Sequence, residues 1–143
     1  MSERPKATVR LIDEAKATGR VASVFEDIKR TKSIDFVPNF WRVIATNADL
    51  LESVWSRLKA LMHPGAEGRK SRLDPLTREI IALSVSATNR CAYCINSHTA
   101  AVRKLGLDVE ALGEVMAIIG LFNMTNALAD GYQVEPDVSP RQD

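Results

Sequence analysis

The sequence predicts an all-α fold, a bundle of about six helices. Its apolar residues recur at steps of three and four over several segments, which is the period of an amphipathic helix. Asp74-Pro75 and Gly106 stand where helices favour such residues, at a start and at a stop. No segment shows the strand pattern of alternating apolar and polar residues between hairpin turns. The length suits one domain, expected over residues 1–143 with its core at about 20–130.

The N-terminal half shows helical period in three segments. We expect helices at about residues 8–32, 38–46 and 50–62. Gly19 divides the first of these into a loose lead-in and a firmer helix. Asp49 is the predicted N-cap of the third, because its carboxylate can accept a hydrogen bond from a backbone N–H of the first turn. Residues 63–75 are polar and locally basic, and form either an anion-binding loop or, more simply, a solvated loop.

The C-terminal half predicts three further helices. They are expected at about residues 75–88, 91–105 and 109–129. The first is apolar nearly all round, which is typical of a helix buried on most of its faces. Asn89-Arg90 is the expected turn between the first two, and the third is strongly apolar on one side. The Pro-containing tail from Val134 to Asp143 is expected to leave the globule as an arm.

Composition excludes several classes of protein. Nineteen basic and eighteen acidic residues give a net charge of +1, which argues against a dedicated binder of nucleic acid or of anionic membranes. The N-terminal residues lack a secretory apolar region, and no run approaches the roughly 18 consecutive apolar residues of a membrane span. We therefore expect a cytoplasmic protein. In that reducing compartment a Cys-x-x-Cys pair is more often catalytic, redox-active or metal-bound than a permanent bridge.

The stretch from Glu79 to His98 gathers the side chains that carry out nucleophilic and proton-transfer chemistry near neutral pH. Cys91, Cys94 and His98 follow one another at steps of three and four, so one helix presents all three on the same face. If the two helices run antiparallel, Glu79 returns to about the level of His98. The carboxylate can then orient the imidazole and relay a proton.

These residues do not decide which cysteine is the nucleophile. The N-terminus of the helix and Arg90 favour a thiolate at Cys91, whereas His98 lies one turn from Cys94 and can accept its proton. Other interpretations also remain open. The pair can be a structural or reversible disulfide without turnover, or part of a zinc site with His98 and Glu79, although zinc sites usually hold richer sulfur sets.

Three further interpretations concern Glu79 itself and residues outside this cluster. Glu79 can instead be a core carboxylate paired with Arg78 or Arg90. His63, beside Pro64, is expected in a loop. The large aromatic residues are expected in the core or in a subunit interface rather than around a substrate. They are Phe40, Trp41, Trp55 and Phe122.

The spacing of Glu79, Cys91, Cys94 and His98, with eleven, two and three residues between them, resembles the signature of the AhpD-like alkylhydroperoxidase branch of the carboxymuconolactone decarboxylase family. Three neighbouring stretches are similar to the peroxidase-related members of that family. They are Val37-Pro38-Asn39-Phe40, Ala82-Leu83-Ser84-Val85-Ser86 and Cys94-Ile95-Asn96-Ser97-His98-Thr99. The resemblance covers about residues 20–130.

The resemblance implies an antioxidant peroxidase that is a homo-oligomer, a trimer or a hexamer, and needs neither a cofactor nor a metal. In it Cys94 matches the peroxidatic cysteine and Cys91 the resolving cysteine, while Glu79 and His98 match the proton relay. A hydroperoxide is the implied substrate. An external dithiol, such as a lipoyl group or a thioredoxin-like protein, is the implied reductant that resets the disulfide.

One position departs from the family pattern. The best-known peroxidase of the family has a second histidine just before the peroxidatic cysteine, and Tyr93 stands there in this chain. A phenol is a poor proton acceptor at neutral pH, so we expect a simpler relay or a weaker activity. Two rival functions remain. One is the cofactor-free lactone decarboxylase activity of the same family, which does not explain a retained Cys-x-x-Cys with Glu79 and His98, and the other is a non-enzymatic oligomer whose assembly or partner contact responds to disulfide formation.

Overall fold

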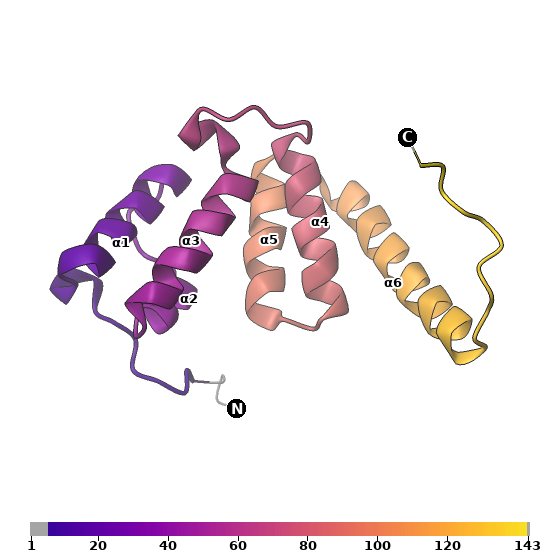
Figure 1. The fold of residues 1–143 in the computed structure, drawn as a ribbon, viewed down its shortest axis with the longest axis horizontal. Coiled ribbons are helices and arrows are strands. Elements are labelled where there is room, and N and C mark those ends of the chain that lie inside the picture. The colour runs from indigo at the N-terminus through magenta and orange to yellow at the C-terminus, as the bar shows by residue number, and fades with distance from the viewer. Residues whose placement is uncertain (1–5, 143) are drawn as a thin grey trace. The chain divides into compact units, whose positions relative to one another are not determined.

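The computed structural model describes residues 6–142, which form six α-helices and two short 3-10 helices without a strand (Figure 1). The predicted all-helical fold is confirmed. Predictions for the Met-Ser-Glu-Arg-Pro start and for Asp143 fall outside the described residues. The chain divides into two compact units, Met1–Arg72 and Leu73–Asp143. That residues 1–143 form a single domain stays a prediction.

The first unit is built around one apolar cluster. Its helices are η1 (Glu14–Lys16), α1 (Gly19–Lys32), α2 (Asn39–Ile44), α3 (Ala48–Met62) and η2 (Pro64–Glu67). The cluster consists of Phe25, Ile28, Val37, Trp41, Ala45, Leu51 and Trp55. The rings of Trp41 and Trp55 meet edge to face with centroids 5.2 Å apart, a favoured aromatic geometry. Gly19, at φ +56°, starts α1 at the predicted break.

The predicted N-cap of α3 was wrong by two residues. The side chain of Asn47 accepts the backbone N–H of Leu50 at 3.1 Å and caps the helix. Asp49 lies in the first turn, where a negative charge still favours the helix, and its carboxylate pairs with Arg20 at 2.7 Å. Asn and Asp are about equally good caps, so the choice between them depends on which residue has the extended backbone required.

The second unit contains a helical hairpin and one long helix. Its helices are α4 (Pro75–Thr88), α5 (Ala92–Lys104) and α6 (Val109–Gly131). Asp74 caps α4 and Asp108 caps α6, as predicted, through backbone N–H groups at 3.0 and 2.8 Å. Gly106 follows α5 with φ +98°, the left-handed geometry that favours glycine. Figure 1 shows α4 between α5 and α6, and α4 packs against both.

The second unit leaves much of its apolar surface exposed. The prediction that α4 is buried on most faces is wrong for this chain, because Ile81 and Val85 are 50% and 54% exposed. Among its described residues α6 has none that is buried, and its apolar residues lie all around the helix rather than on one side. Three helices present too little surface to cover both sides of the hairpin and the whole of α6.

The length and composition of α6 also suffice to cross a membrane, and none of its apolar window is buried in the chain. One such helix is weak evidence for a membrane span, because core and interface helices share these properties. A count of consecutive apolar residues overlooked it, because Gly120, Asn123 and Thr125 interrupt the run.

Candidate redox site

The hairpin turn places the first cysteine. Arg90 has φ +58°, and the N–H groups of Arg90 and Cys91 donate to the carbonyls of Ala87 at 3.2 Å and Ser86 at 3.0 Å. This pair of bonds is the Schellman arrangement that ends many helices, with Arg90 where glycine is usual. Cys91 is then also the N-cap of α5, because its Sγ accepts the backbone N–H of Cys94 at 3.3 Å. Cys91 is therefore fixed between the end of α4 and the start of α5.

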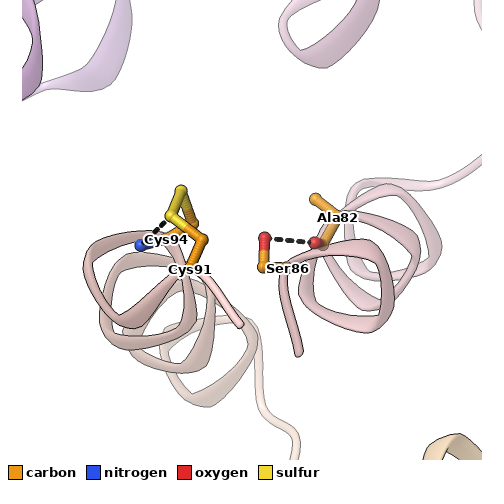
Figure 2. The surroundings of a disulfide bond; sticks show 4 residues. All are labelled: Ala82, Ser86, Cys91 and Cys94. Carbon is orange, nitrogen blue, oxygen red and sulfur yellow. Dashed lines mark hydrogen bonds between the residues drawn. A yellow bond between two sulfur atoms is a disulfide. The ribbon is translucent and has the colours of Figure 1, made fainter. Parts of the chain in front are cut away.

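Cys91 and Cys94, the only cysteines of the chain, form a disulfide (Figure 2). Both residues are half-buried, so the bond is partly accessible from outside. It lies at the N-terminal end of α5, where the unpaired N–H groups and the helix dipole favour negative charge. After reduction, the same groups would favour a thiolate.

Glu79 and His98 meet across the hairpin, as their spacing predicts. The Nδ1 atom of His98 lies 2.7 Å from Oε2 of Glu79, and their side chains are 27% and 16% exposed. With Nδ1–H donating to the carboxylate, the other ring nitrogen of His98 carries the lone pair that can accept a proton. Cys94 lies one turn earlier on the same helix, so the imidazole and the disulfide share one end of the hairpin.

Two other predicted partners of the site occupy defined positions. Arg78, considered as a partner of Glu79, donates from its guanidinium to the carbonyl of Leu73 at 2.7 Å. Tyr93, which replaces the family histidine, is exposed beside the disulfide. Over residues 6–142, no three His, Cys, Asp or Glu side chains are grouped closely enough to hold a metal ion.

Ser86 is a residue that the sequence did not single out. It is 8% exposed, and its hydroxyl donates to the carbonyl of Ala82 at 2.7 Å. Figure 2 shows its side chain on the side of α4 that faces the disulfide. It follows Glu79 by seven residues, two helical turns, so both lie on the same face of α4. That spacing was the signal in the sequence that would have identified it.

The residues outside the hairpin are placed less specifically. His63 ends α3, and its ring centroid lies 6.5 Å from that of Trp55. In the basic loop, Arg69 pairs with Glu67 at 3.3 Å, and both Lys70 and Arg72 are exposed. These contacts suit a solvated loop, and anion binding there stays a prediction.

Fold and site together define an all-helical protein with a Cys-x-x-Cys disulfide at the turn of a helical hairpin, beside a Glu–His pair. The model of the carboxymuconolactone decarboxylase family matches residues 56–134, more than half of the chain. The chain therefore belongs to the carboxymuconolactone decarboxylase family.

The comparisons place the chain near AhpD proteins of that family. It is similar to the crystal structure of the alkylhydroperoxidase AhpD core from Rhodospirillum rubrum, with 44% identity and a TM-score of 0.84 over 93% of this chain and 96% of that one. The alkyl hydroperoxide reductase AhpD of Streptomyces griseus is 28% identical over 93% of this chain and 73% of its own length. The protein of that name from Brucella abortus is 32% identical over 74% of this chain, but only 59% of its own length is covered. The predicted AhpD-like fold is confirmed.

Proposed function

We propose that this protein is an alkylhydroperoxidase-like enzyme that reduces hydroperoxides with its Cys91–Cys94 pair. The observation that carries the proposal is the meeting of a disulfide and a Glu79–His98 hydrogen bond at one hairpin. A structural disulfide alone needs no carboxylate–imidazole pair one turn away. The similarity to proteins named alkyl hydroperoxide reductase supports the same activity.

The reaction begins from the reduced pair. His98 accepts the proton of the Cys94 thiol, and Glu79 orients the imidazole and stabilises its cationic form. The Cys94 thiolate attacks the terminal oxygen of the hydroperoxide, so an S–O bond forms and the O–O bond breaks. The alkoxide that leaves takes up the proton from His98 and departs as the alcohol. Cys94 is now a sulfenic acid.

The second cysteine completes the oxidation. The sulfur of Cys91 attacks the sulfur of the sulfenic acid, and hydroxide leaves and is protonated to water. A Cys91–Cys94 disulfide, the bond that this structure contains, is the expected product of that step. A dithiol, such as a lipoyl group or a thioredoxin-like protein, then donates two electrons and two protons by thiol–disulfide exchange and becomes a disulfide itself.

Cys94 is assigned as the attacking cysteine because it lies on the His98 side of the helix turn. Cys91 occupies the N-cap position, where the helix N-terminus favours its thiolate in the exchange with the reductant. Tyr93 supplies no second base beside Cys94, so the relay consists of Glu79 and His98. We expect turnover to be slower than in a site with an additional histidine.

Assembly and location complete the proposal. We propose a cytoplasmic homo-oligomer, a trimer or a hexamer. The exposed apolar residues of α6 and of α4 support self-association, because large apolar patches on soluble proteins usually mark interfaces. Light scattering of the purified chain at several concentrations measures the assembly directly.

The test is hydroperoxide-dependent consumption of a dithiol by the purified protein. The wild type is expected to consume many equivalents of dithiol per chain, and Cys94→Ser none above background. Ser97→Ala, an exposed hydroxyl on the same helix, is the matched control and should keep wild-type turnover. A wild type that oxidises once and does not cycle would contradict the proposal and favour the redox-responsive oligomer.

A further inference from the structure

Ser86 brings a buried hydroxyl to the redox pair. Among the described residues, Ser86 is the only polar or charged residue that is buried, with 8% of its surface exposed. Its backbone carbonyl accepts the N–H of Cys91 at 3.0 Å, which ties it directly to the first cysteine. Its side chain projects from α4 toward the disulfide-bearing end of α5 (Figure 2). The backbone of Ser86 therefore bonds to the pair directly, and its side chain lies on the face of α4 that is turned toward the pair.

The present hydrogen bond of this hydroxyl can be given up at little cost. The hydroxyl donates to the Ala82 carbonyl at 2.7 Å. In an α-helix that carbonyl already accepts the backbone N–H four residues later, so it does not depend on the hydroxyl. A hydroxyl hydrogen rotates about its C–O bond without moving the oxygen. Disulfide sulfur is a weak acceptor, whereas a thiolate is charged and accepts strongly.

We propose that Ser86 makes the Cys91–Cys94 pair easier to reduce, by turning its hydroxyl hydrogen from the Ala82 carbonyl to a cysteine thiolate that reduction creates. The inference rests on the proposed function in that the pair must cycle between disulfide and dithiol. In the reducing half-reaction the S–S bond accepts two electrons and one proton from a dithiol, which leaves one cysteine as a thiol and the other as a thiolate, and the second proton of the dithiol passes to the solvent. A hydrogen bond made only to the reduced form shifts this equilibrium toward reduction.

The chain offers a matched control two residues away. Ser84, also on α4, donates from its hydroxyl to the carbonyl of Ile80 at 2.7 Å, which is the same type of bond two residues earlier in the chain. Two residues correspond to about 200° around a helix, so Ser84 points away from the face that carries Ser86. Ser84→Ala removes the same local bond without touching the face toward the disulfide.

The experiment measures the redox equilibrium of the full chain without peroxide. The protein is equilibrated at pH 7 with mixtures of reduced and oxidised dithiothreitol, and the disulfide fraction is counted from the mass added by alkylation. Because the chain has only two cysteines, the equilibrium is a single two-electron step. We expect Ser86→Ala to lower the equilibrium constant for reduction about tenfold, a shift of about 30 mV. Ser84→Ala should stay within about twofold of wild type.

Ser86→Thr restores a hydroxyl on the same carbon and should return the constant toward the wild-type value. Circular dichroism shows whether each variant is folded. If Ser86→Ala is unfolded, a folded Ser86→Thr whose constant falls about tenfold below wild type, although it keeps the hydroxyl, would overturn the inference. An unchanged constant in Ser86→Ala, or an equal shift in Ser84→Ala, would overturn the inference. The assay contains no hydroperoxide, so a protein without peroxidase turnover can still pass it and an active one can still fail it.

Discussion

The first unit buries seven apolar side chains in one cluster, whereas the described residues of the second bury only Leu83 and Val102 among their apolar side chains. The hydrogen bonds of charged side chains also differ between the two units. In the first unit Asp27 accepts bonds from Trp55 at 2.7 Å and from Lys59 at 2.9 Å, which ties the core to a polar network. In the second unit the ion pair that the structure gives among the described residues joins His98 to Glu79 across the hairpin.

This difference indicates that the two units are stabilised in different ways. The first unit buries seven apolar residues in its own core, so the packing of that core stabilises it. The second unit keeps many of its large apolar residues exposed. Its small core and exposed α6 are typical of an element that is covered by another surface in the working assembly. Three of the following pairs of variants compare the two units, and one pair compares two carboxylates within the first unit.

The largest expected effect concerns the two histidines, one in each unit. His98→Ala removes the base beside Cys94 and is expected to slow peroxide reduction by about 10²- to 10⁴-fold, the usual contribution of a general acid–base residue. His63→Ala, near Trp55 in the first unit, should change the rate less than about threefold. Stopped-flow oxidation of the reduced chain by cumene hydroperoxide measures both. Equal losses in the two variants would show that the effect is structural.

The next effect compares two phenylalanines. Phe25 is 1% exposed in the first core, and Phe122 on α6 is 56% exposed. Phe25→Ala leaves a cavity and is expected to lower the free energy of unfolding by about 3–5 kcal/mol. Phe122→Ala should change that of the isolated chain by less than about 0.5 kcal/mol, the range for surface sites.

Urea denaturation at low protein concentration measures both phenylalanine variants. Repeating the denaturation at high protein concentration tests whether α6 is covered in an assembly. If it is, the loss of unfolding free energy caused by Phe122→Ala grows with protein concentration. A concentration-independent Phe122→Ala would contradict an interface on this helix.

Much of the site was predictable because its signals are local. Asp74, Asp108 and Gly106 are helix ends that the chain marks within a few residues of each boundary. The approach of Glu79 to His98 followed from helix rise once the turn at Asn89-Arg90 was located. Such signals do not depend on the rest of the protein.

What the sequence did not predict depends on contacts between distant parts. The burial of α4 was overestimated because an apolar helix has the same pattern whether its own chain or another surface covers it. The choice of Asn47 over Asp49 depended on one backbone dihedral, which neither side chain reveals. The spacing of Ser86 from Glu79 is visible in the sequence, but its position on the side of α4 that faces the disulfide depends on how α5 packs against α4.

A smaller effect concerns how the stability of the folded chain depends on pH. Burial raises the pKa of Asp27, but bonds from Lys59, Trp55 and Arg30 outweigh it and hold the pKa below the usual 3.8. The folded chain therefore binds this proton less readily than the unfolded chain. The resulting stability is present above pH 4 and is lost as the pH falls through the lower folded pKa.

Asp27→Asn is expected to cost about 1–3 kcal/mol at pH 7 and to reduce the loss of stability between pH 7 and pH 3. Urea denaturation at both pH values measures it. Asp49→Asn, whose side chain is 81% exposed, is the control and should leave both values within about 0.5 kcal/mol. A wild type equally stable at both pH values would contradict the role of Asp27.

The smallest effect decides whether the two units fold as one domain. Asn47 caps α3 in the first unit and Asp108 caps α6 in the second, with bonds of 3.1 and 2.8 Å. Replacing either with alanine costs about 1 kcal/mol of helix stability. Because a single domain is predicted, both variants should shift one common unfolding transition, seen alike by the fluorescence of Trp41 and Trp55 in the first unit and by circular dichroism of all helices. If Asp108→Ala shifts the circular dichroism but leaves the fluorescence transition in place, the units unfold separately, and the redox hairpin depends on its assembly rather than on the first core.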